Sequence, residues 1–193
     1  MNNKEMKEFF DALAADWNNC PDEYEKREKI VSLANFDQNS VIADIGCGRG
    51  VMLPHLMKVS PKEIIAIDLS SEMIKYAKST FGVNKITYLN EDLLAADLQT
   101  LDAAIVYNAY PHFPDKQAFA EKLFKHLKKD GIFIIAHGRG KSSINGTHSG
   151  KAVSKISVPL EEAEKEAKKF EQFFTLQKFI DNEDCYFIKF SRK

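Results

Sequence analysis

The chain lacks an excess of either charge: 27 Lys and Arg residues stand against 28 Asp and Glu residues, which gives a net charge of −1 over 193 residues. A general nucleic-acid binder normally carries a strong basic excess, so this balance argues against a nucleic-acid partner. Apolar residues make up 44% and charged residues 28%, which is typical of a folded globular protein. The length favours a single domain with a substantial core.

Long apolar runs and cysteine patterns are also absent. No stretch approaches the 18 apolar residues of a transmembrane helix, so the sequence predicts no membrane partner. Residues 1–5 lack the apolar core of a signal peptide, which makes the cytoplasm the expected location. The chain has three cysteines, an odd number, at Cys20, Cys47 and Cys185. They are widely spaced and form no C-x-x-C pair, so neither a disulfide framework nor a zinc site is indicated.

Short, β-prone apolar runs alternate with helical patterns along the middle of the chain. Nearly continuous apolar strands separated by helices predict a parallel sheet covered on both faces, hence a doubly wound α/β fold. Ser70 is a candidate N-cap of one of the helices. The predicted strands are residues 41–45, 63–68, 85–89, 101–107 and 131–137, and the predicted helices between them are 51–59, the one that opens at 70–73, and 115–129.

Two further segments frame this core. Residues 4–17 and 22–35 have helical patterns, with a break around Cys20 and Pro21. At the other end, a helix over 161–174 precedes strands at 174–180 and 185–191, which we expect to form an antiparallel hairpin around the turn at 181–184. The prediction is therefore one domain with a mostly parallel, seven-stranded sheet. Its expected parts are cap helices at 1–36, a ligand-binding core at 37–137, a lid loop at 138–158, and a terminal helix and hairpin at 159–193.

A glycine-rich turn follows the first predicted strand and precedes a helix. Its sequence, Asp-Ile-Gly-Cys-Gly-Arg-Gly over residues 44–50, lets the backbone approach a ligand closely at a helix N-terminus. Val51 occupies the third glycine position of a dinucleotide fingerprint, and no G-K-[ST] follows, so nicotinamide and P-loop ligands are disfavoured. Asp44 would repel a pyrophosphate but would hold a cationic amino group. Cys47 is interpreted as a small residue of this loop.

A second acid stands at the end of the next predicted strand. Asp68 lies 24 residues beyond Asp44, at the place where an acid commonly accepts hydrogen bonds from two ribose hydroxyls. A ligand with a ribose, an amino group and no phosphate is a nucleoside amino acid. S-adenosylmethionine fits this description.

With these residues the chain resembles the class I S-adenosylmethionine-dependent methyltransferases, whose fold is Rossmann-like. The resemblance covers roughly residues 10–191 and places five segments in the family's order. They are the first motif at 41–50, the second at 67–70, the segment that contacts adenine at 90–93, the fourth strand at 101–108, and the entry to the fifth strand at 127–133.

The resemblance implies a role for each matching residue. Asp44, Gly46 and Gly48 would line the methionine moiety, and Asp68 would hold the ribose. Leu69 and Met73 would lie against the adenine, while the segment with Asp92 and Leu93 would contact it, with Asp92 accepting from its amino group. Asn108 would begin the face where the methyl is transferred. Trp17 resembles the end of the N-terminal helix that closes over the cofactor.

Histidines gather where acceptor chemistry is expected, after the carboxyl ends of the strands. His112 follows the fourth strand, His137 ends the fifth, and His148 lies in the loop beyond. A histidine with a pKa near neutrality is a candidate general base, so His112 and His137 are the predicted catalytic residues. The three imidazoles are also candidate ligands of a divalent metal, the less favoured alternative, because their spacing forms no metal motif.

The remaining features bear on the acceptor. Residues 109–111 depart from the Asn/Asp-Pro-Pro-Tyr/Phe pattern of amino-directed nucleic-acid methyltransferases, which also speaks against a nucleic-acid substrate. Arg139, Lys141 and Lys151 make the glycine-rich lid loop basic, which suits an acceptor with a carboxylate or phosphate. We therefore predict methyl transfer to an oxygen, nitrogen or sulfur nucleophile of a small molecule. The alternatives are a metal-assisted methyltransferase and a non-catalytic subunit that binds S-adenosylmethionine.

Overall fold

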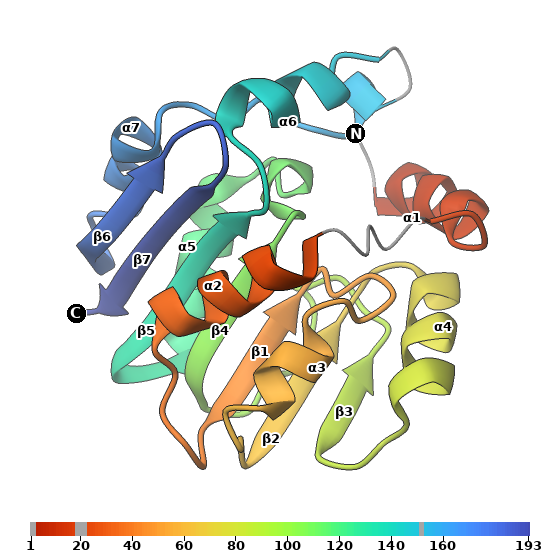
Figure 1. The fold of residues 1–193 in the computed structure, drawn as a ribbon, viewed down its shortest axis with the longest axis horizontal. Helices are drawn as coiled ribbons and strands as arrows, with labels where there is room; N and C mark the ends of the chain where they lie inside the picture. The colour runs from red at the N-terminus through yellow and green to blue at the C-terminus, as the bar shows by residue number, and fades with distance from the viewer. Residues whose placement is uncertain (1–2, 18–22, 151–152) are drawn as a thin grey trace.

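A computed structural model describes residues 3–17, 23–150 and 153–193. In this part of the chain seven strands form one sheet in the order β3-β2-β1-β4-β5-β7-β6 (Figure 1). The first five strands pair in parallel, and β7 lies antiparallel between β5 and β6. This confirms the predicted mostly parallel, seven-stranded sheet with a terminal antiparallel hairpin. The strands are β1 (Val41–Ile45), β2 (Glu63–Ile67), β3 (Ile86–Leu89), β4 (Leu101–Tyr107), β5 (Leu127–His137), β6 (Phe174–Asp181) and β7 (Tyr186–Arg192).

The sheet separates two apolar layers, because successive side chains of a strand point to opposite faces. Ala43 and Ile45 of β1 pack with α5 (Lys116–His126) and α7 (Ala163–Lys168). Ile42 of the same strand packs on the other face with α2 (Tyr24–Ala34) and α3 (Leu53–Met57). Figure 1 shows α2 and α3 on the near face of the sheet and α5 behind it.

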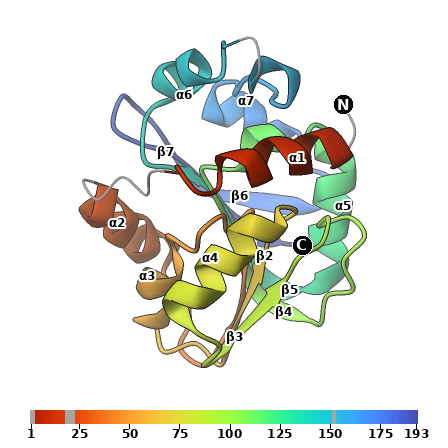
Figure 2. The same cartoon turned by 90° about the vertical axis from the view of Figure 1, so that its right-hand side faces the viewer.

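The helices begin at residues that cap them. Ser70 precedes α4 (Ser71–Phe81) and its hydroxyl accepts a hydrogen bond from the Met73 N–H at 3.1 Å, which confirms the predicted cap. Asp115 caps α5 in the same way by accepting from the Ala118 N–H at 2.9 Å. The N-terminal helix α1 (Asn3–Leu13) does not pack on the sheet. It lies across the end of α4 (Figure 2).

Several predicted boundaries were wrong. The helix predicted over 161–174 ends at Lys168, because the following residues tighten into turns in which the Phe170 and Phe173 N–H groups donate to carbonyls three residues earlier. The helix predicted over 51–59 is regular only at 53–57, and β5 begins at Leu127, where the sequence predicted the end of a helix. The predicted lid loop is partly helical, with α6 (Lys141–Thr147) and the short 3-10 helix η3 (Val153–Lys155).

Three residues named in the sequence analysis are not among those that the structure describes. Cys20, Pro21 and Lys151 lie outside the described residues. Among the residues that the structure describes, no helix has both the length and the apolar character needed to cross a membrane.

Candidate cofactor and acceptor site

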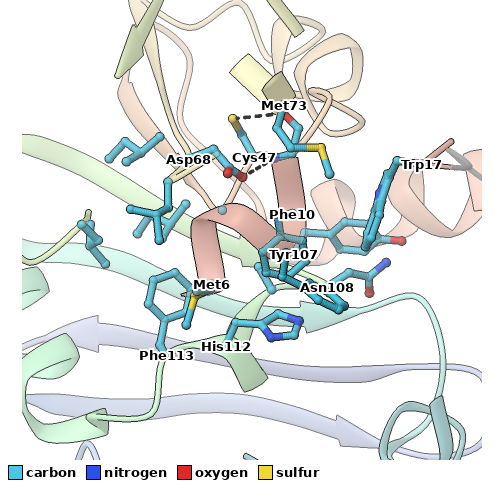
Figure 3. A pocket seen from close by; sticks show the side chains of 18 of the residues that line it. Met6, Phe10, Trp17, Cys47, Asp68, Met73, Tyr107, Asn108, His112 and Phe113 are labelled. Atoms are coloured by element: carbon cyan, nitrogen blue, oxygen red, sulfur yellow. Dashed lines mark hydrogen bonds between the residues drawn. The ribbon is translucent and has the colours of Figure 1, made fainter. Parts of the chain in front are cut away.

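A cavity of about 480 Å³ opens at the carboxyl ends of the parallel strands, where α1 covers it (Figure 2, Figure 3). This volume lies in the range of pockets that enclose small ligands. Most of the residues that the sequence singled out line it together, although they come from segments far apart in the chain. These are Trp17, Gly46, Cys47, Gly48, Asp68, Leu69, Met73, Asp92, Leu93, Asn108, His112, His137 and His148.

The glycine loop after β1 forms one wall of the cavity. Gly46 and Gly48 of this loop adopt backbone angles that favour glycine. Gly46 has a φ of +66°, and a Cβ built there would lie 2.6 Å from the Cβ of Ala109. Gly48 has a φ of +53° and open space where its Cβ would be. Gly46 is therefore needed for the packing of the loop, whereas Gly48 leaves room on the cavity side.

The Asp68 carboxylate stands at the end of β2 and is held by two backbone groups. Its Oδ2 accepts from the Gly48 N–H and its Oδ1 from the Ser70 N–H, both at 2.8 Å. Each carboxylate oxygen accepts about two hydrogen bonds, so capacity remains for a ligand in the cavity. Burial raises the pKa of Asp68 to about 6 against the lowering effect of these two hydrogen bonds.

Asp44 lies on β1 and does not itself line the cavity. Its side chain is buried, and its Oδ2 has no hydrogen-bond partner among the described residues. Burial, with a smaller contribution from the nearby Asp68 charge, raises its pKa to about 7. A buried carboxylate oxygen without a partner is costly, so the site fits a ligand or water that supplies a donor or a cation there.

The segment after β3 closes the same side of the cavity. Asp92 accepts from the Asn3 side-chain amide of α1 at 2.7 Å, and Asn90 donates to the backbone carbonyl of Leu69 at 2.9 Å. Met73 and Leu93 are buried at this end. The side chains predicted to surround an adenine thus do come together, although their role stays a prediction.

An aromatic wall supplied by α1 was only partly foreseen. Phe10 packs edge-on against Trp17 at 5.9 Å and against His112 at 5.0 Å between ring centroids (Figure 3). Met6 of the same helix also lines the cavity. Trp17 remains 39% exposed. The helical spacing of Met6, Phe10 and Leu13 is the signal in the sequence that marks this face of α1.

Three histidines meet at the acceptor side of the cavity, as predicted from their places after the strands. The His112 and His148 rings are 5.1 Å apart, and their Nδ1 atoms lie 2.9 Å from the Ile156 carbonyl and 2.7 Å from the Ile144 carbonyl. A carbonyl only accepts, so each Nδ1 carries the proton and donates, which leaves Nε2 as the acceptor. Burial lowers the pKa of His112 to about 4 and that of His137 to about 3, so both rings are neutral at pH 7.

A metal site does not emerge from these histidines. Across the described ranges, no group of three or more His, Cys, Asp or Glu residues is arranged to hold a metal ion. His137 is fully buried, and its Nε2 has no partner in the same part of the chain.

Sequence reasoning singled out Arg139 as a basic residue of the lid loop but missed the other members of a charged cluster on the cavity wall. Glu23 and Arg27 of the α2 region, Tyr107 at the end of β4 and Arg139 after β5 all line the cavity. Arg27 is only 6% exposed and shares the buried face of α2 with Ile30. A charged residue on an apolar helical face was the available signal, but the many charges of residues 23–29 hid it.

Comparison with known proteins supports the predicted family. Residues 42–131, just under half of the chain, match a family model described as a methyltransferase domain. This match is consistent with the predicted class I S-adenosylmethionine-dependent methyltransferases and with S-adenosylmethionine as the cofactor.

Curated relatives of the methyltransferase domain differ in what their names say they modify. The chain is 28% identical over 169 residues to malonyl-acyl-carrier-protein O-methyltransferase of Acetivibrio thermocellus, covering 83% of this chain and 56% of that protein. It is 23% identical over 140 residues to ribosomal RNA small subunit methyltransferase A of Staphylococcus carnosus, covering 68% of this chain and 47% of that protein. The chain thus spans about half the length of these curated relatives.

Solved structures of methyltransferases share the fold of this chain. The complex of the Haloferax volcanii Trm112 methyltransferase activator with a methyltransferase matches with a TM-score of 0.80 at 16% identity, over 95% of this chain and 97% of that one. The N-methyltransferase NodS of Bradyrhizobium japonicum, solved with S-adenosyl-L-homocysteine, matches with a TM-score of 0.71 at 17% identity, over 89% of this chain and 88% of that one.

Proposed function

We propose that this protein transfers the methyl group of S-adenosylmethionine to an oxygen, nitrogen or sulfur nucleophile of a small molecule. The observation that carries the proposal is the Asp68 carboxylate, fixed by two backbone N–H groups at the wall of a cavity that α1 covers. Asp68 would accept hydrogen bonds from the ribose hydroxyls. Leu69, Met73, Asp92 and Leu93 would surround the adenine.

The methionine end of the cofactor would lie over the glycine loop. Gly46 and Gly48 let the backbone approach it, Cys47 fills the turn, and Asp44 would favour the ammonium group from below. Asn108 would begin the transfer face, where its Oδ1 accepts from the Gly138 N–H at 3.2 Å and ties the end of β4 to the residue after β5. When bound, S-adenosylmethionine supplies an electrophilic methyl group on a sulfonium. The acceptor attacks that carbon while the sulfur–carbon bond breaks and its electron pair stays on sulfur.

The histidines would prepare the acceptor for this displacement. The Nε2 of His112 carries a lone pair, because its Nδ1 proton is donated to the Ile156 carbonyl. A neutral His112 would accept a hydrogen bond from an O–H, N–H or S–H of the acceptor and orient it for in-line attack. Its pKa of about 4 makes it a weak base, so orienting the acceptor is its main contribution. His137, also neutral, is the second candidate for this role.

The size of the cavity and the cover by α1 support a small acceptor rather than a nucleic acid. A folded RNA or DNA would need a broad open surface, whereas the proposed site is a partly open cavity of about 480 Å³ that α1 covers on one side.

Isothermal calorimetry with S-adenosylmethionine and S-adenosylhomocysteine tests the proposal. We expect both to bind one to one, and Asp68→Ala to weaken binding at least tenfold, because one carboxylate anchors two hydroxyls. The matched control is Asp97→Ala, which removes an exposed acid that does not line the cavity. Absence of binding by the wild-type protein would refute the proposal.

Turnover separates an enzyme from a non-catalytic subunit. Conversion of labelled S-adenosylmethionine with a panel of small acceptors should fall at least a hundredfold in His112→Ala and recover in part in His112→Gln, which keeps a hydrogen-bond acceptor. Tight cofactor binding without turnover on any acceptor would favour the non-catalytic alternative.

A further inference from the structure

Three hydrogen-bonding side chains line the cavity beyond the ends of β4 and β5. Asn108 follows β4, His112 ends the 3-10 helix η2 (Tyr110–His112), and His137 ends β5. Asp68 stands at the end of β2, on the other side of β1 in the sheet. The three side chains therefore lie in the part of the cavity where the acceptor, not the adenosine, is expected.

Asn108 is held with its amide N–H groups left to donate. Its Oδ1 accepts from the Gly138 N–H at 3.2 Å, so the amide nitrogen points away from that contact. Within the described residues these N–H groups have no hydrogen-bond partner. The backbone of Asn108 has a φ of +54°, which asparagine adopts more readily than most residues. Asn108 thus offers a donor to a ligand in the cavity.

His112 offers the opposite group. Its Nδ1–H donates to the Ile156 carbonyl at 2.9 Å, so its Nε2 carries a lone pair. The backbone N–H of His112 donates to the Ala109 carbonyl at 3.0 Å and closes the turn that begins after Asn108. This turn brings the donor of Asn108 and the lone pair of His112 to the same end of the cavity (Figure 3).

Neighbouring donors of the cavity wall are already engaged. The Nδ1–H of His148 and the hydroxyl of Thr147 donate to the Ile144 carbonyl, at 2.7 and 2.8 Å. The Tyr107 hydroxyl donates to the Glu23 Oε2 at 3.0 Å. These side chains have therefore spent the donors that would otherwise compete with a ligand for the lone pair of His112.

A hydroxyl group complements this pattern. It donates one hydrogen bond and accepts through two lone pairs, so it can donate to His112 and accept from Asn108 at once. A carboxylate only accepts, and it would meet the lone pair of His112. An ammonium only donates, and it has no lone pair with which to attack a methyl group. The burial that lowers the pKa of His112 to about 4 also disfavours an ammonium beside it.

His137 adds a buried ring without a partner to the same end of the cavity. Its side chain is 1% exposed, and its Nε2 has no hydrogen-bond partner in the described part of the chain. A buried polar atom without a partner is costly, and a ligand that supplies one removes the cost. A neutral imidazole has one N–H and one lone pair, and a hydroxyl complements either of them.

Aromatic rings bound this end of the cavity. Phe10 of α1 packs edge-on against His112 at 5.0 Å between ring centroids, and Phe113 directly follows His112. Both phenylalanines line the cavity and are only partly buried, so apolar ring surface remains uncovered there (Figure 3). A further aromatic ring would cover this surface in the edge-on or offset geometries that such rings prefer.

We propose that the methyl acceptor is a small phenol, whose hydroxyl donates to the Nε2 of His112 and accepts from the amide of Asn108. This inference rests on the proposed function and narrows its substrate class. The phenol oxygen forms a bond to the methyl carbon while the sulfur–carbon bond breaks and its electron pair stays on sulfur. The hydroxyl proton passes to the Nε2 of His112. The oxygen becomes much more acidic as the new bond forms, so a weak base is sufficient to take this proton.

The probes for the binding test are p-cresol and p-fluorotoluene, which differ by a hydroxyl against a fluorine of similar size. Each is titrated into the protein saturated with S-adenosylhomocysteine. We expect p-cresol to bind the wild-type protein at least tenfold more tightly, and His112→Phe to reduce this preference to about twofold. His126→Phe is the matched control, because His126 ends α5 and does not line the cavity; it should keep the preference.

Asn108→Asp tests the donor and keeps the test decisive if His112→Phe does not fold. Aspartate retains an acceptor for the Gly138 N–H and tolerates a positive φ, but it replaces the amide donor by a second carboxylate oxygen. Methylation of p-cresol should fall at least tenfold. The variant should also gain affinity for p-methylbenzylamine, which the wild-type protein should bind at least tenfold more weakly than p-cresol. A variant that only disturbed the fold would show no such gain.

Three results would overturn the proposal. The first is that the wild-type protein binds p-cresol no more tightly than p-fluorotoluene, including the case in which it binds neither. The second is binding of p-cresol without its methylation. The third is tighter binding of p-toluidine, p-methylbenzylamine or p-toluate than of p-cresol. In each case, binding of S-adenosylhomocysteine by the wild-type protein would leave the proposed function standing, whereas loss of that binding would refute both.

Discussion

At the scale of single residues, we expect the carboxylates of Asp44 and Asp68, beside the glycine loop, to make cofactor binding depend on pH. In the free protein the pKa of Asp68 is about 6 and that of Asp44 about 7. Ribose hydroxyls would favour ionised Asp68, and an ammonium would favour ionised Asp44, so binding lowers both pKa values. A group whose pKa falls on binding gives affinity that is present above its free-state pKa and lost as the pH falls through it.

We therefore expect the affinity for S-adenosylhomocysteine to rise between pH 5 and pH 8. Each group weakens binding about tenfold for each pH unit below its free-state pKa. Calorimetry across this range checks the slope, and Asp68→Asn should remove the step near pH 6 while keeping the step near pH 7. An affinity that is flat over the range would contradict the assigned contacts of both acids.

Gly46 and Gly48 of the loop should respond differently to substitution by alanine. At Gly46 the new Cβ would meet the Ala109 Cβ at 2.6 Å and the φ of +66° disfavours it, so we expect Gly46→Ala to lower the unfolding free energy by about 2 kcal/mol or more. At Gly48 the Cβ enters open space, so the loss should be about 1 kcal/mol. Urea unfolding measures both. Because Gly48 faces the cavity, its variant should lose cofactor affinity by more than its stability change suggests.

At the scale of elements, hydrogen bonds attach α1 and the residues that follow it to two segments that we propose bind the cofactor, the start of α4 and the glycine loop. The Asp11 Oδ1 of α1 accepts from the Ser70 hydroxyl at 2.6 Å and from the Glu72 N–H at 3.1 Å, at the start of α4. At the other end, Arg49 of the glycine loop donates to the Trp17 carbonyl at 3.1 Å and lies 4.3 Å over the Tyr76 ring. The Trp17 carbonyl lies four residues beyond the end of α1, so Arg49 ties the segment that follows this helix to the glycine loop and to α4.

Loss of this contact should free the helix without unfolding the sheet. We expect Arg49→Ala to raise the dissociation rate of S-adenosylhomocysteine about tenfold, with only a small change in the melting temperature. Trp17 is the one tryptophan of the chain and lines the cavity, so its fluorescence reports dissociation in stopped flow. Lys75→Ala, which removes an exposed charge of α4, is the matched control. An unchanged dissociation rate in Arg49→Ala would show that the arginine does not hold α1.

A buried polar contact fixes the segment that carries His112. The Tyr110 hydroxyl of the 3-10 helix η2 (Tyr110–His112) donates to the Glu166 Oε1 of α7 at 2.6 Å, and both side chains are buried. Glu166→Ala leaves that hydroxyl without its partner, so we expect a loss of about 2 kcal/mol in unfolding free energy. Tyr110→Phe together with Glu166→Ala should cost less than the sum of the two single variants. Additive losses in this cycle would mean that the contact contributes nothing.

At the scale of the whole molecule, sequence reasoning succeeded where the signal is local or topological. Apolar runs such as 41–45, followed by glycines or acids, predicted the parallel strands. They also predicted the edge of the sheet at which Asp68 and His112 both line the cavity. Arg139 was named as a basic residue of the lid loop, but its place beside Arg27 was missed because the charged cluster is assembled across the fold, from residues more than a hundred positions apart. The helix predicted over 161–174 was too long because its apolar spacing did not show where Phe170 and Phe174 turn into the core.

Ligand binding should stabilise the molecule as one unit, since the cavity is lined by α1, by residues after β1 to β5 and by α6. At a ligand concentration of a hundred times Kd, binding adds about 2.7 kcal/mol to the folded state. For a chain of 193 residues this corresponds to a rise of about 5–10 °C in melting temperature. We expect this rise with S-adenosylhomocysteine, together with slower hydrogen exchange in α1 and α6 as well as in the glycine loop. Protection confined to the glycine loop would mean that α1 and α6 do not close over the ligand, whereas Asp68→Ala at the same ligand concentration should show about half of the shift or less and a matching loss of protection.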